Sequence, residues 1–531
     1  MRTNRSSCLN FLALLFVAPA VAGCSSGTSN NIPGNNKIPP AIQSMADAVV
    51  RDLTAQGYEV SRGYMKTFTN EDCASAIAVM GQCFANNPTA PYVLPILKTW
   101  KDEYVDPATV GGVGKVAAGY ASPFRFDPRE AVVLLGVMPP EARYFGCQTY
   151  QFTAAGVVNK TTDIYKRITE NFPDTAGQFF DPSPSGRLMS FASISNSSNN
   201  VEFEQQAGTF FGQVRSFIIT PDQAMDRTVR ASLAKSGLPA TSTLTEAIPS
   251  SVTTGLTTAA DDFVTIIRYA LPRDEKLGNQ WRQDLPVAVI RVRDAKAAHQ
   301  SEPFPAFDHP AARSSVDENW LSTDLDTLNN NVRAAWGLPP APVQPSLADR
   351  MMDMQRVMPF DLVGPDCMRN TMNCWGDTQD TSYSGNGNVL LENDAGQILY
   401  AVVGTLGTKT GNGTYMSLSV YRALYIQGVE NVSDAVLETS QGKLPQQPAS
   451  FQNADKFFLW YFARSCAAVT TGNCTEIPES LIPRGEPMKL AVRNYIKPGT
   501  MHGPNTDPAV NPLGQSPLLT PWVIPIPLEA R

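Results

Sequence analysis

Apolar residues recur at helical spacing soon after the start of the chain. They occupy one face of a segment that Pro39 and Pro40 precede and Gly57 ends. The residues of this face are Ile42, Met45, Ala46, Val49 and Leu53. We predict a helix from Ile42 to Gln56 that packs this face inward.

A second helix start is encoded at Thr220-Pro221-Asp222-Gln223. Thr220 is the expected cap, Pro221 the first helical residue and Gln223 the capping-box partner, with the end at Gly237. Apolar strand patterns precede it at Arg215–Ile219 and follow it at Phe263–Ile267. A strand, a helix and a strand in this order predict one crossover unit.

Further strands are predicted by apolar runs between turn residues. Ala131–Met138 and Arg143–Phe152 flank Pro139-Pro140 and are expected to pair, and Pro286–Val292 is another strand. A meander is expected from Val389–Leu391, Ile398–Val403 and Tyr415–Tyr421. Its last strand alternates, with one dry and one wet face. The dry face has Met416, Leu418 and Val420, and the wet face has Tyr415, Ser417, Ser419 and Tyr421.

Proline density marks the strongest linker signal, at residues 337–346, since proline at this density excludes helix and central strand. We place a domain boundary there, between an α+β domain at 41–336 and a β-rich domain at 347–531. No fixed-period repeat is present. The predicted class is α+β, with mainly antiparallel sheets, a few packed helices and two domains.

The N-terminus has the order of a signal peptide at residues 1–23, with Arg2 and Arg5 before an apolar stretch at Phe11–Ala18 that is too short to span a bilayer. Val21-Ala22-Gly23-Cys24 resembles the lipobox of bacterial lipoproteins. The resemblance implies cleavage before Cys24, acylation of that cysteine and a lipid anchor in the membrane. The alternative is an ordinary secretory signal followed by a chance cysteine.

Residues 24–40 are rich in Gly, Ser, Asn and Pro, which predicts a flexible tether. Ser25 and Ser26 follow the lipobox cysteine, and the resemblance then implies the outer membrane of a Gram-negative bacterium. The longest other apolar run, Ala131–Met138, has the length of a strand. The lipid is therefore the one membrane contact that the sequence predicts.

Composition and net charge add two points to this prediction. A chain of 531 residues with 43% hydrophobic residues can bury a large core. The net charge of -7 and the lack of long basic clusters argue against nucleic acid as a partner.

Seven cysteines follow Cys24, and six of them form close pairs, which suggests local disulfides in an oxidising compartment. The pairs are Cys73 with Cys83, Cys367 with Cys374 and Cys466 with Cys474. The first pair requires its helix to stop near Gly81 and the chain to fold back, because ten helical residues span about 15 Å. Otherwise each of these two cysteines bonds elsewhere. Cys147 is the candidate for a free thiol. Zinc is a weaker alternative, since no histidine lies beside these pairs.

Catalytic motifs are incomplete. Gly-x-Ser-x-Gly does not occur, and His299, His309 and His502 form no His-Glu-x-x-His. Asp308-His309 could orient an imidazole toward a Cys147 nucleophile, although a buried thiol in a strand is more simply packing. The glycines of Gly112–Ala117 lack the context of a nucleotide loop.

Acidic residues offer a better cluster. Asp377 and Asp380 follow Cys374 in a loop that a disulfide would pin, where two carboxylates could bind a hard cation or act as acid and base. Glu202 and Glu204 are a second pair, on one face of an extended segment. Turn formation and exposure to water are the simpler interpretation of both pairs.

Methionines are dense between residues 351 and 372, and exported thioethers can hold copper(I). Met351, Met354 and Met358 also fit the core face of a helix begun at Ser346, which is the simpler interpretation. We therefore predict no cofactor and no metal.

Two functions remain. The first is a lipid-anchored, exported cell-envelope protein that presents loops and an aromatic-bearing sheet face to a ligand or an envelope protein. The alternative is an exported hydrolase that uses Asp377 and Asp380. The absence of a complete catalytic motif favours the first.

Overall fold

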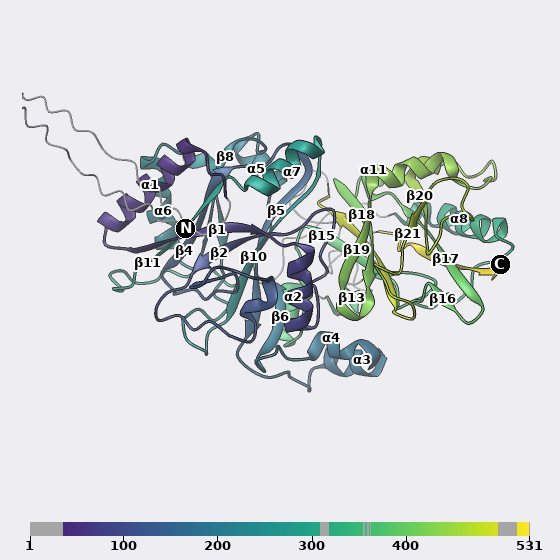
Figure 1. Ribbon diagram of the computed structural model, residues 1–531, viewed down its shortest axis with the longest axis horizontal. Helices are drawn as coiled ribbons and strands as arrows, with labels where there is room; N and C mark the ends of the chain where they lie inside the picture. Colours follow the sequence, from purple (N-terminus) through teal and green to yellow (C-terminus); the bar gives the residue numbers. More distant parts are fainter. Residues whose placement is uncertain are drawn as a thin grey trace, which may run out of the picture. The chain divides into compact units, whose positions relative to one another are not determined.

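A computed structural model of the chain describes residues 36–171, 173–307, 318–353, 356–357, 360–361, 363–497 and 518–529. The signal peptide, Cys24 and the tether up to residue 35 lie outside the described residues, as do Asp308, His309 and His502. The described residues belong to one compact unit. The structure confirms the α+β class with mainly antiparallel sheets (Figure 1).

One large sheet organises the chain from Glu59 to Arg293. Its strands are β1 (Glu59–Thr67), β2 (Val93–Lys98), β3 (Tyr120–Ala121), β4 (Glu130–Val137), β5 (Ala142–Ala154), β6 (Leu188–Ser193), β7 (Ser198–Asn199), β8 (Val214–Thr220), β9 (Thr243–Ala247), β10 (Asp262–Pro272) and β11 (Val287–Arg293). Their order is β6-β5-β10-β2-β1-β11-β4-β8-β9, with β3 on β2 and β7 on β5. Only β8 and β9 pair in parallel within this sheet of the described chain.

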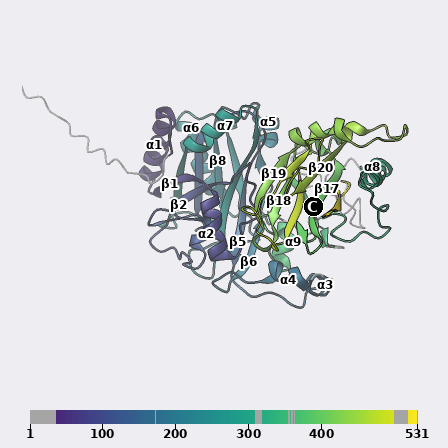
Figure 2. The same cartoon turned by 45° about the vertical axis from the view of Figure 1, so that its right-hand side comes forward.

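The helices are distributed around the sheets. They are α1 (Pro40–Ala55), α2 (Asn70–Met80), α3 (Asp163–Asn171), α4 (Pro173–Phe180), α5 (Asn200–Ala207), α6 (Gln223–Lys235), α7 (Glu275–Asp284), α8 (Ser322–Ala335), α9 (Gly364–Arg369), α10 (Gly407–Thr410) and α11 (Asp434–Leu437). The expected first helix is confirmed as α1, which lies beside α6 on one face of the large sheet (Figures 1 and 2). Ile42, Ala46, Val49 and Leu53 are buried there, so the apolar stripe faces the core.

The crossover unit exists with a different second strand. The chain runs from β8 through α6 into β9, which lies parallel to β8, whereas the expected partner at 263–267 is part of β10, between β5 and β2. The helix also begins later than expected. Asp222 is its N-cap, and the Asp222 carboxylate accepts a hydrogen bond from the Ala224 N–H at 3.2 Å. A carboxylate at the cap satisfies helix N–H groups better than Thr220 could from two residues upstream.

The predicted pairing across Pro139-Pro140 is wrong. The expected strands form as β4 and β5, but β4 lies between β11 and β8, while β5 pairs with β10 along most of its length. Nearly every residue of β4 is buried. A strand that is apolar on both faces needs a neighbour on each side and cover above and below, which a simple hairpin does not supply.

The remaining strands follow residue 351. They are β12 (Met352–Asp353), β13 (Arg356–Val357), β14 (Phe360–Asp361), β15 (Thr381–Gly385), β16 (Glu392–Asn393), β17 (Gly396–Thr405), β18 (Tyr415–Arg422), β19 (Gln427–Ser433), β20 (Phe457–Ala463), β21 (Cys474–Glu476), β22 (Met488–Tyr495) and β23 (Trp522–Glu529). One sheet has the order β12-β15-β22-β18-β19, and a second has β16-β17-β20-β21 with β23 on β17. The helix expected from Ser346 is wrong, because Met352 and Asp353 form the short strand β12. Met354 and Met358 lie outside the described residues.

The predicted meander is also wrong, because β17 and β18 belong to different sheets. Val402 of β17 and Leu418 of β18 meet in one apolar core between these sheets. The opposite face of β17, with Leu399, Ala401 and Val403, packs in a second core. A strand that is apolar on both faces is covered on both, so β17 cannot be a neighbour of β18 within one half-exposed sheet.

Helix α8 contributes Leu325, Leu328 and Val332 to that second core, against β17 and β23. The helix therefore packs with the C-terminal sheets, although it precedes the proline-rich boundary expected at 337–346. The part of the chain that packs with the C-terminal sheets therefore includes α8, which precedes residues 337–346.

The structure has the three expected disulfides, with Cα–Cα distances of 5.2 Å for Cys73–Cys83, 5.7 Å for Cys367–Cys374 and 5.9 Å for Cys466–Cys474. Helix α2 stops at Met80 and Gly81 adopts a φ of 72°, which reverses the chain and brings Cys83 back to Cys73. Cys147 is the free, buried cysteine among the described residues. The disulfides indicate an oxidising, exported location. Within the described chain, no helix combines the length and apolarity needed to span a membrane.

Candidate functional site

One face of the sheet around β22 is apolar, and the other carries charged and aromatic residues. Met488, Leu490 and Val492 face the core between the two C-terminal sheets. The alternate residues Lys489, Ala491 and Arg493 therefore share the opposite face. This is also the expected wet face of β18, but here it is covered by other parts of the chain: Tyr415 and Tyr421 are only 2% and 3% exposed.

Small residues form a row across this face. Gly385 of β15 and Ser419 of β18 lie directly opposite Ala491 on its two sides. The neighbouring positions are large, because Tyr383 pairs with Arg493 and Tyr421 pairs with Lys489. Of this row, Ala491 lines a cavity that the flanking long side chains also border.

A cavity of about 80 Å³ that is partly open to solvent has Ala491 in its wall. Five aromatic rings form part of its wall. The rings are those of Tyr92, Phe179, Trp375, Tyr383 and Tyr421. Lys489 and Arg493 add two cationic groups, and Asp377 adds one carboxyl group. Cavities with apolar walls and a few polar groups are the usual form of small-molecule sites.

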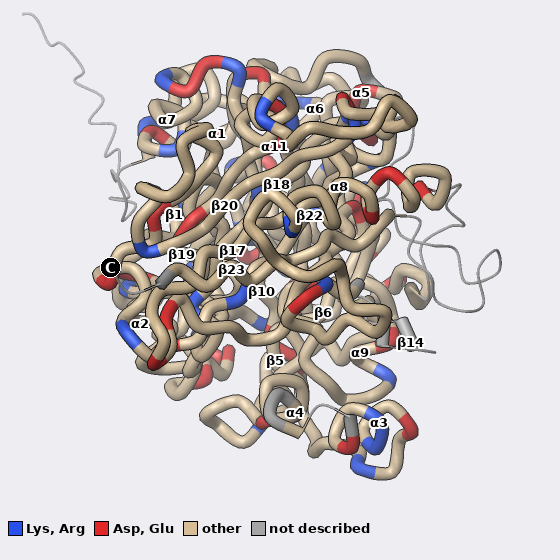
Figure 3. Tube along the Cα trace, turned by 90° about the vertical axis from the view of Figure 1, so that its right-hand side faces the viewer, with Lys and Arg blue, Asp and Glu red and all other residues tan. Residues whose placement is uncertain are grey.

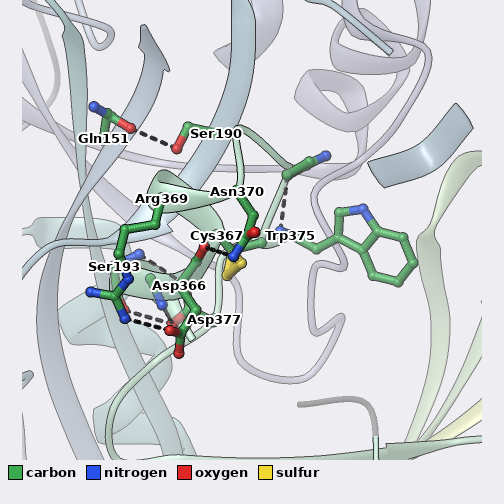
Figure 4. Close-up of a disulfide and its surroundings, with 12 residues drawn as sticks. Gln151, Ser190, Ser193, Asp366, Cys367, Arg369, Asn370, Trp375 and Asp377 are labelled. Carbon is green, nitrogen blue, oxygen red and sulfur yellow. Dashed lines mark hydrogen bonds and ion pairs between the residues drawn. A yellow bond between two sulfur atoms is a disulfide. The ribbon is translucent and has the colours of Figure 1, made fainter. Parts of the chain in front are cut away.

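The loop that carries Trp375 is held on several sides. Cys374 bonds covalently to Cys367 of α9, and its N–H donates to the Ser190 carbonyl at 2.8 Å. The Trp375 indole N–H donates to the Gln178 carbonyl at 2.8 Å, and its ring stacks on Phe179 at 4.4 Å. The Trp375 and Asp377 side chains leave this loop in different directions (Figure 4). The indole is therefore fixed at the cavity wall before any ligand arrives.

Gly376 is the position where the loop passes the aromatic core. Its φ is 70°, and a Cβ atom there would lie 2.6 Å from the Phe191 ring. No other residue fits both requirements without displacing Phe191. The close approach of this loop to Phe191 therefore requires glycine at position 376.

Asp377 is an acceptor for three hydrogen bonds. They come from the Ser193 N–H at 2.9 Å, the Ser193 hydroxyl at 2.6 Å and the Gly364 N–H at 2.8 Å. Burial raises the pKa of Asp377 to about 6, although these hydrogen bonds oppose the shift. The carboxylate ties β6 to the start of α9, which is a structural use of the group.

Asp380 is also engaged. Its carboxylate accepts from the Tyr144 hydroxyl at 2.8 Å, from the Asn199 amide at 3.3 Å and from the Thr378 hydroxyl. Asp377 and Asp380 thus lie in one buried region, as the sequence suggested, but each serves as an acceptor between segments of the chain. Asp377 borders the cavity, and Asp380 is not among its lining residues.

Two buried arginines in this region lack an acidic partner. Arg268 of β10 donates to the Tyr150 hydroxyl at 2.7 Å and to the Gly376 carbonyl at 3.3 Å. Arg493 donates from Nη2 to the Ala85 carbonyl at 2.5 Å and to the Tyr421 hydroxyl. Neither forms an ion pair with a described residue, and the Nε of Arg268 has no hydrogen-bond partner.

Aromatic faces surround these cations. Arg268 lies over the Tyr92 ring, with its Cζ 5.1 Å from the ring centroid, and Arg493 lies 5.6 Å from the Tyr421 centroid. The Lys489 ammonium is 6.0 Å from the Trp375 ring. Burial lowers the pKa of Lys489. A cation–π contact contributes about 2 kcal/mol when desolvated, less than the several kcal/mol that removing each charge from water costs.

The other buried arginines that the structure describes form ion pairs. Arg125 meets Asp262 at 2.7 Å, and Arg291 meets Glu103 at 2.6 Å. Along the described trace, acidic and basic positions are interspersed rather than gathered in one run (Figure 3). Arg268 and Arg493 therefore differ from the other buried arginines of the described residues.

The other candidate residues lie apart from the cavity. Cys147 is in β5, three positions from Tyr144, so the two side chains are on opposite faces of the strand. Burial raises the pKa of the Cys147 thiol well above its ordinary value. Glu202 and Glu204 are in helix α5 rather than in an extended segment, because the Asn199 side chain caps a helix there. Two residues apart on a helix, they do not share a face.

The remaining histidine that the structure describes is His299, which lies between Asp222 at 2.6 Å and Asp294 at 2.8 Å. No group of three or more His, Cys, Asp or Glu side chains suited to a metal ion occurs within the described ranges. Gly112 and Val113 belong to a short 3-10 turn at Val110–Val113.

Sequence reasoning missed Arg268, Lys489 and Arg493. A usable signal existed, because Arg268 interrupts an apolar strand and Lys489 and Arg493 alternate with apolar residues on β22. Such alternation is ordinarily a solvated face, and nothing local shows that another sheet covers it.

No family model matches the chain, and no curated protein matches it either. Among solved structures, the chain is similar to an uncharacterised protein from Burkholderia cenocepacia, at 8% identity and a TM-score of 0.35, over 92% of this chain and 87% of that one. A likeness at this level carries no argument about function.

Proposed function

We propose that this chain is a lipid-anchored protein of the cell envelope that binds a small ligand in the cavity over Ala491. The observation that carries the proposal is the cavity itself, with five aromatic rings, two cationic groups and a wall loop held by the Cys367–Cys374 disulfide. Preformed walls of this kind lower the entropy lost on binding.

Both acids already accept hydrogen bonds from other parts of the chain, which supports a binding protein over a hydrolase. Asp377 accepts three hydrogen bonds from Ser193 and Gly364, and Asp380 accepts from Tyr144. A general acid or base needs a free path to substrate, and these carboxylates are committed to neighbouring segments.

Filling the cavity is expected to abolish binding. A ligand found by thermal-shift screening of sugars, peptides, lipids and organic acids should raise the melting temperature and change the fluorescence of Trp375. In Ala491→Leu, the added side chain occupies the space over the small row, so both effects should disappear while the fold is retained. The matched control is Ala467→Leu, at an exposed position, which should bind as the natural chain does.

Two results would contradict ligand binding in this cavity. One is a ligand that binds Ala491→Leu with unchanged affinity, and the other is a screen in which no compound raises the melting temperature of the natural chain.

The lipid anchor rests on Val21-Ala22-Gly23-Cys24, together with the oxidising location that the disulfides indicate. Mass spectrometry of the mature protein should find an acylated Cys24 at its amino terminus. Cys24→Ser should leave the protein unacylated and move it from the outer-membrane fraction to the soluble fraction. Cys8→Ser, within the signal peptide, is the matched control and should leave attachment intact. An unacylated natural amino terminus would rule the anchor out.

A further inference from the structure

Two cations without an acidic partner, Lys489 and Arg493, line the cavity, and a third, Arg268, lies over the ring of Tyr92 in its wall. Arg268 and Arg493 are 4% and 3% exposed, and neither they nor Lys489 form an ion pair with any residue that the structure describes. Asp377 is the carboxyl group at the cavity wall, but Ser193 and Gly364 already occupy its oxygens. The cavity thus has an excess of positive charge in a region largely removed from water.

Arg493 has N–H donors that make no hydrogen bond with the described residues. Both of its hydrogen bonds come from Nη2, to the Ala85 carbonyl and the Tyr421 hydroxyl. Its Nε and Nη1 groups make no hydrogen bond within the described part of the chain, although the guanidinium borders the cavity. A free N–H of this guanidinium can donate a charge-assisted hydrogen bond to a carboxylate oxygen.

The register places the free space between the two cations of β22. Ala491 is two residues from Arg493 and two from Lys489 on the same face, which is about 7 Å along the strand in each direction. Both side chains are long enough to reach an anion seated over Ala491. Beyond Lys489 lies the Trp375 ring, which offers an apolar surface beside the charged end.

We propose that the ligand of this cavity is an organic carboxylate with an apolar, unsaturated body. Its carboxylate lies over Ala491 between Arg493 and Lys489, and its body lies against Trp375. The inference rests on the proposed ligand-binding function and adds the chemical class of the ligand.

The test uses the mature chain and matched probe pairs of the same shape: benzoate with benzamide, and phenylacetate with phenylacetamide. Calorimetry and thermal shifts should show binding of the two acids and at least tenfold weaker binding of the amides, since the charge-assisted contacts are lost. Raising the salt concentration should weaken binding of the acids and leave binding of the amides unchanged.

Lys489→Met is the decisive variant, because Lys489 has no polar partner among the described residues and its loss leaves no group unsatisfied. The variant should bind the two acids about tenfold more weakly and should unfold at the same or a higher temperature, since an unpaired, desolvated ammonium is removed. Lys276→Met, at an exposed position, is the matched control and should change neither property.

The outcomes separate the two proposals. If the amides bind as well as the acids, the cavity binds ligands but the carboxylate inference is overturned. If neither acid binds, or if Lys489→Met binds them with unchanged affinity, the inference is overturned as well. Other ligands that lose binding in Ala491→Leu would still support the proposed function, and only the absence of every ligand would overturn both.

Discussion

Replacing Arg291 by methionine should lower the free energy of unfolding by about 3–5 kcal/mol, because it leaves two buried carboxylates without a cation. Arg291 is fully buried, and its guanidinium contacts Glu103 at 2.6 Å and Glu130. It also donates to the carbonyls of Lys98 at 3.0 Å and Arg125 at 2.6 Å. Methionine fills part of the same volume, so the loss measures the charge and the donors more than the packing.

Urea unfolding at pH 8, where Glu130 with its pKa of about 7 is mostly ionised, gives the free energy directly when it is followed by circular dichroism. Arg227→Met is the matched control, since its ion pair with Glu302 is 60% and 51% exposed and its removal should not change stability measurably. Burial raises the pKa of Glu130 to about 7, so the cost of Arg291→Met should shrink when this carboxyl group is protonated at pH 5. Equal stability of the Arg291 and Arg227 variants would mean that the buried cluster is not ionised as described.

Short-range signals predicted the parts of the fold that depend on neighbouring residues. The apolar spacing of Ile42 to Leu53 is enough to form α1, and the close cysteine pairs form disulfides because a turn brings each pair together. Gly81 is a clear example. The sequence required a chain reversal there if Cys73 was to reach Cys83, and the left-handed glycine supplies it.

The order of strands could not be obtained in this way. β4 and β5 are separated by two prolines, yet their partners β11 and β10 lie more than one hundred residues away in sequence. β17 and β18 are consecutive long strands but belong to different sheets. A strand that is apolar on both faces gives no local indication of which neighbour it takes, because many partners satisfy the same pattern.

The candidate site, like the strand order, could be predicted only in part from the sequence. Asp377 and Asp380 were found because they lie together in one loop, whereas Arg268 comes from β10 and Lys489 and Arg493 come from β22, far apart in the sequence. Their shared property is the lack of an acidic partner, and that becomes visible only when the packing of the sheets is known. Alternating polar residues on β18 and β22 predict a solvated face until another element covers it.

Acidification from pH 8 to pH 5 should stabilise the chain. Burial raises the pKa of Glu246 from 4.5 to about 8, so the folded chain keeps this proton where the unfolded chain has lost it. The stability that this group contributes is fully present below about pH 4.5 and is lost as the pH rises through about 8. Its slope reaches about 1.4 kcal/mol per pH unit. Glu130, with a pKa of about 7, and Asp377, with a pKa of about 6, change stability in the same direction.

Glu246→Gln isolates the largest of these contributions. The amide oxygen can still accept the hydrogen bond from the Thr149 N–H, but it cannot ionise, so stability at pH 5 should be kept and the fall toward pH 8 should become shallower. Glu479→Gln, at an exposed ion pair with Arg484, should leave the slope as it is in the natural chain. Urea unfolding at half-unit pH steps measures all three proteins. A natural chain whose stability rises from pH 5 to pH 8 would contradict the burial of these acids, because only a group that the fold holds in its neutral form gives the opposite slope.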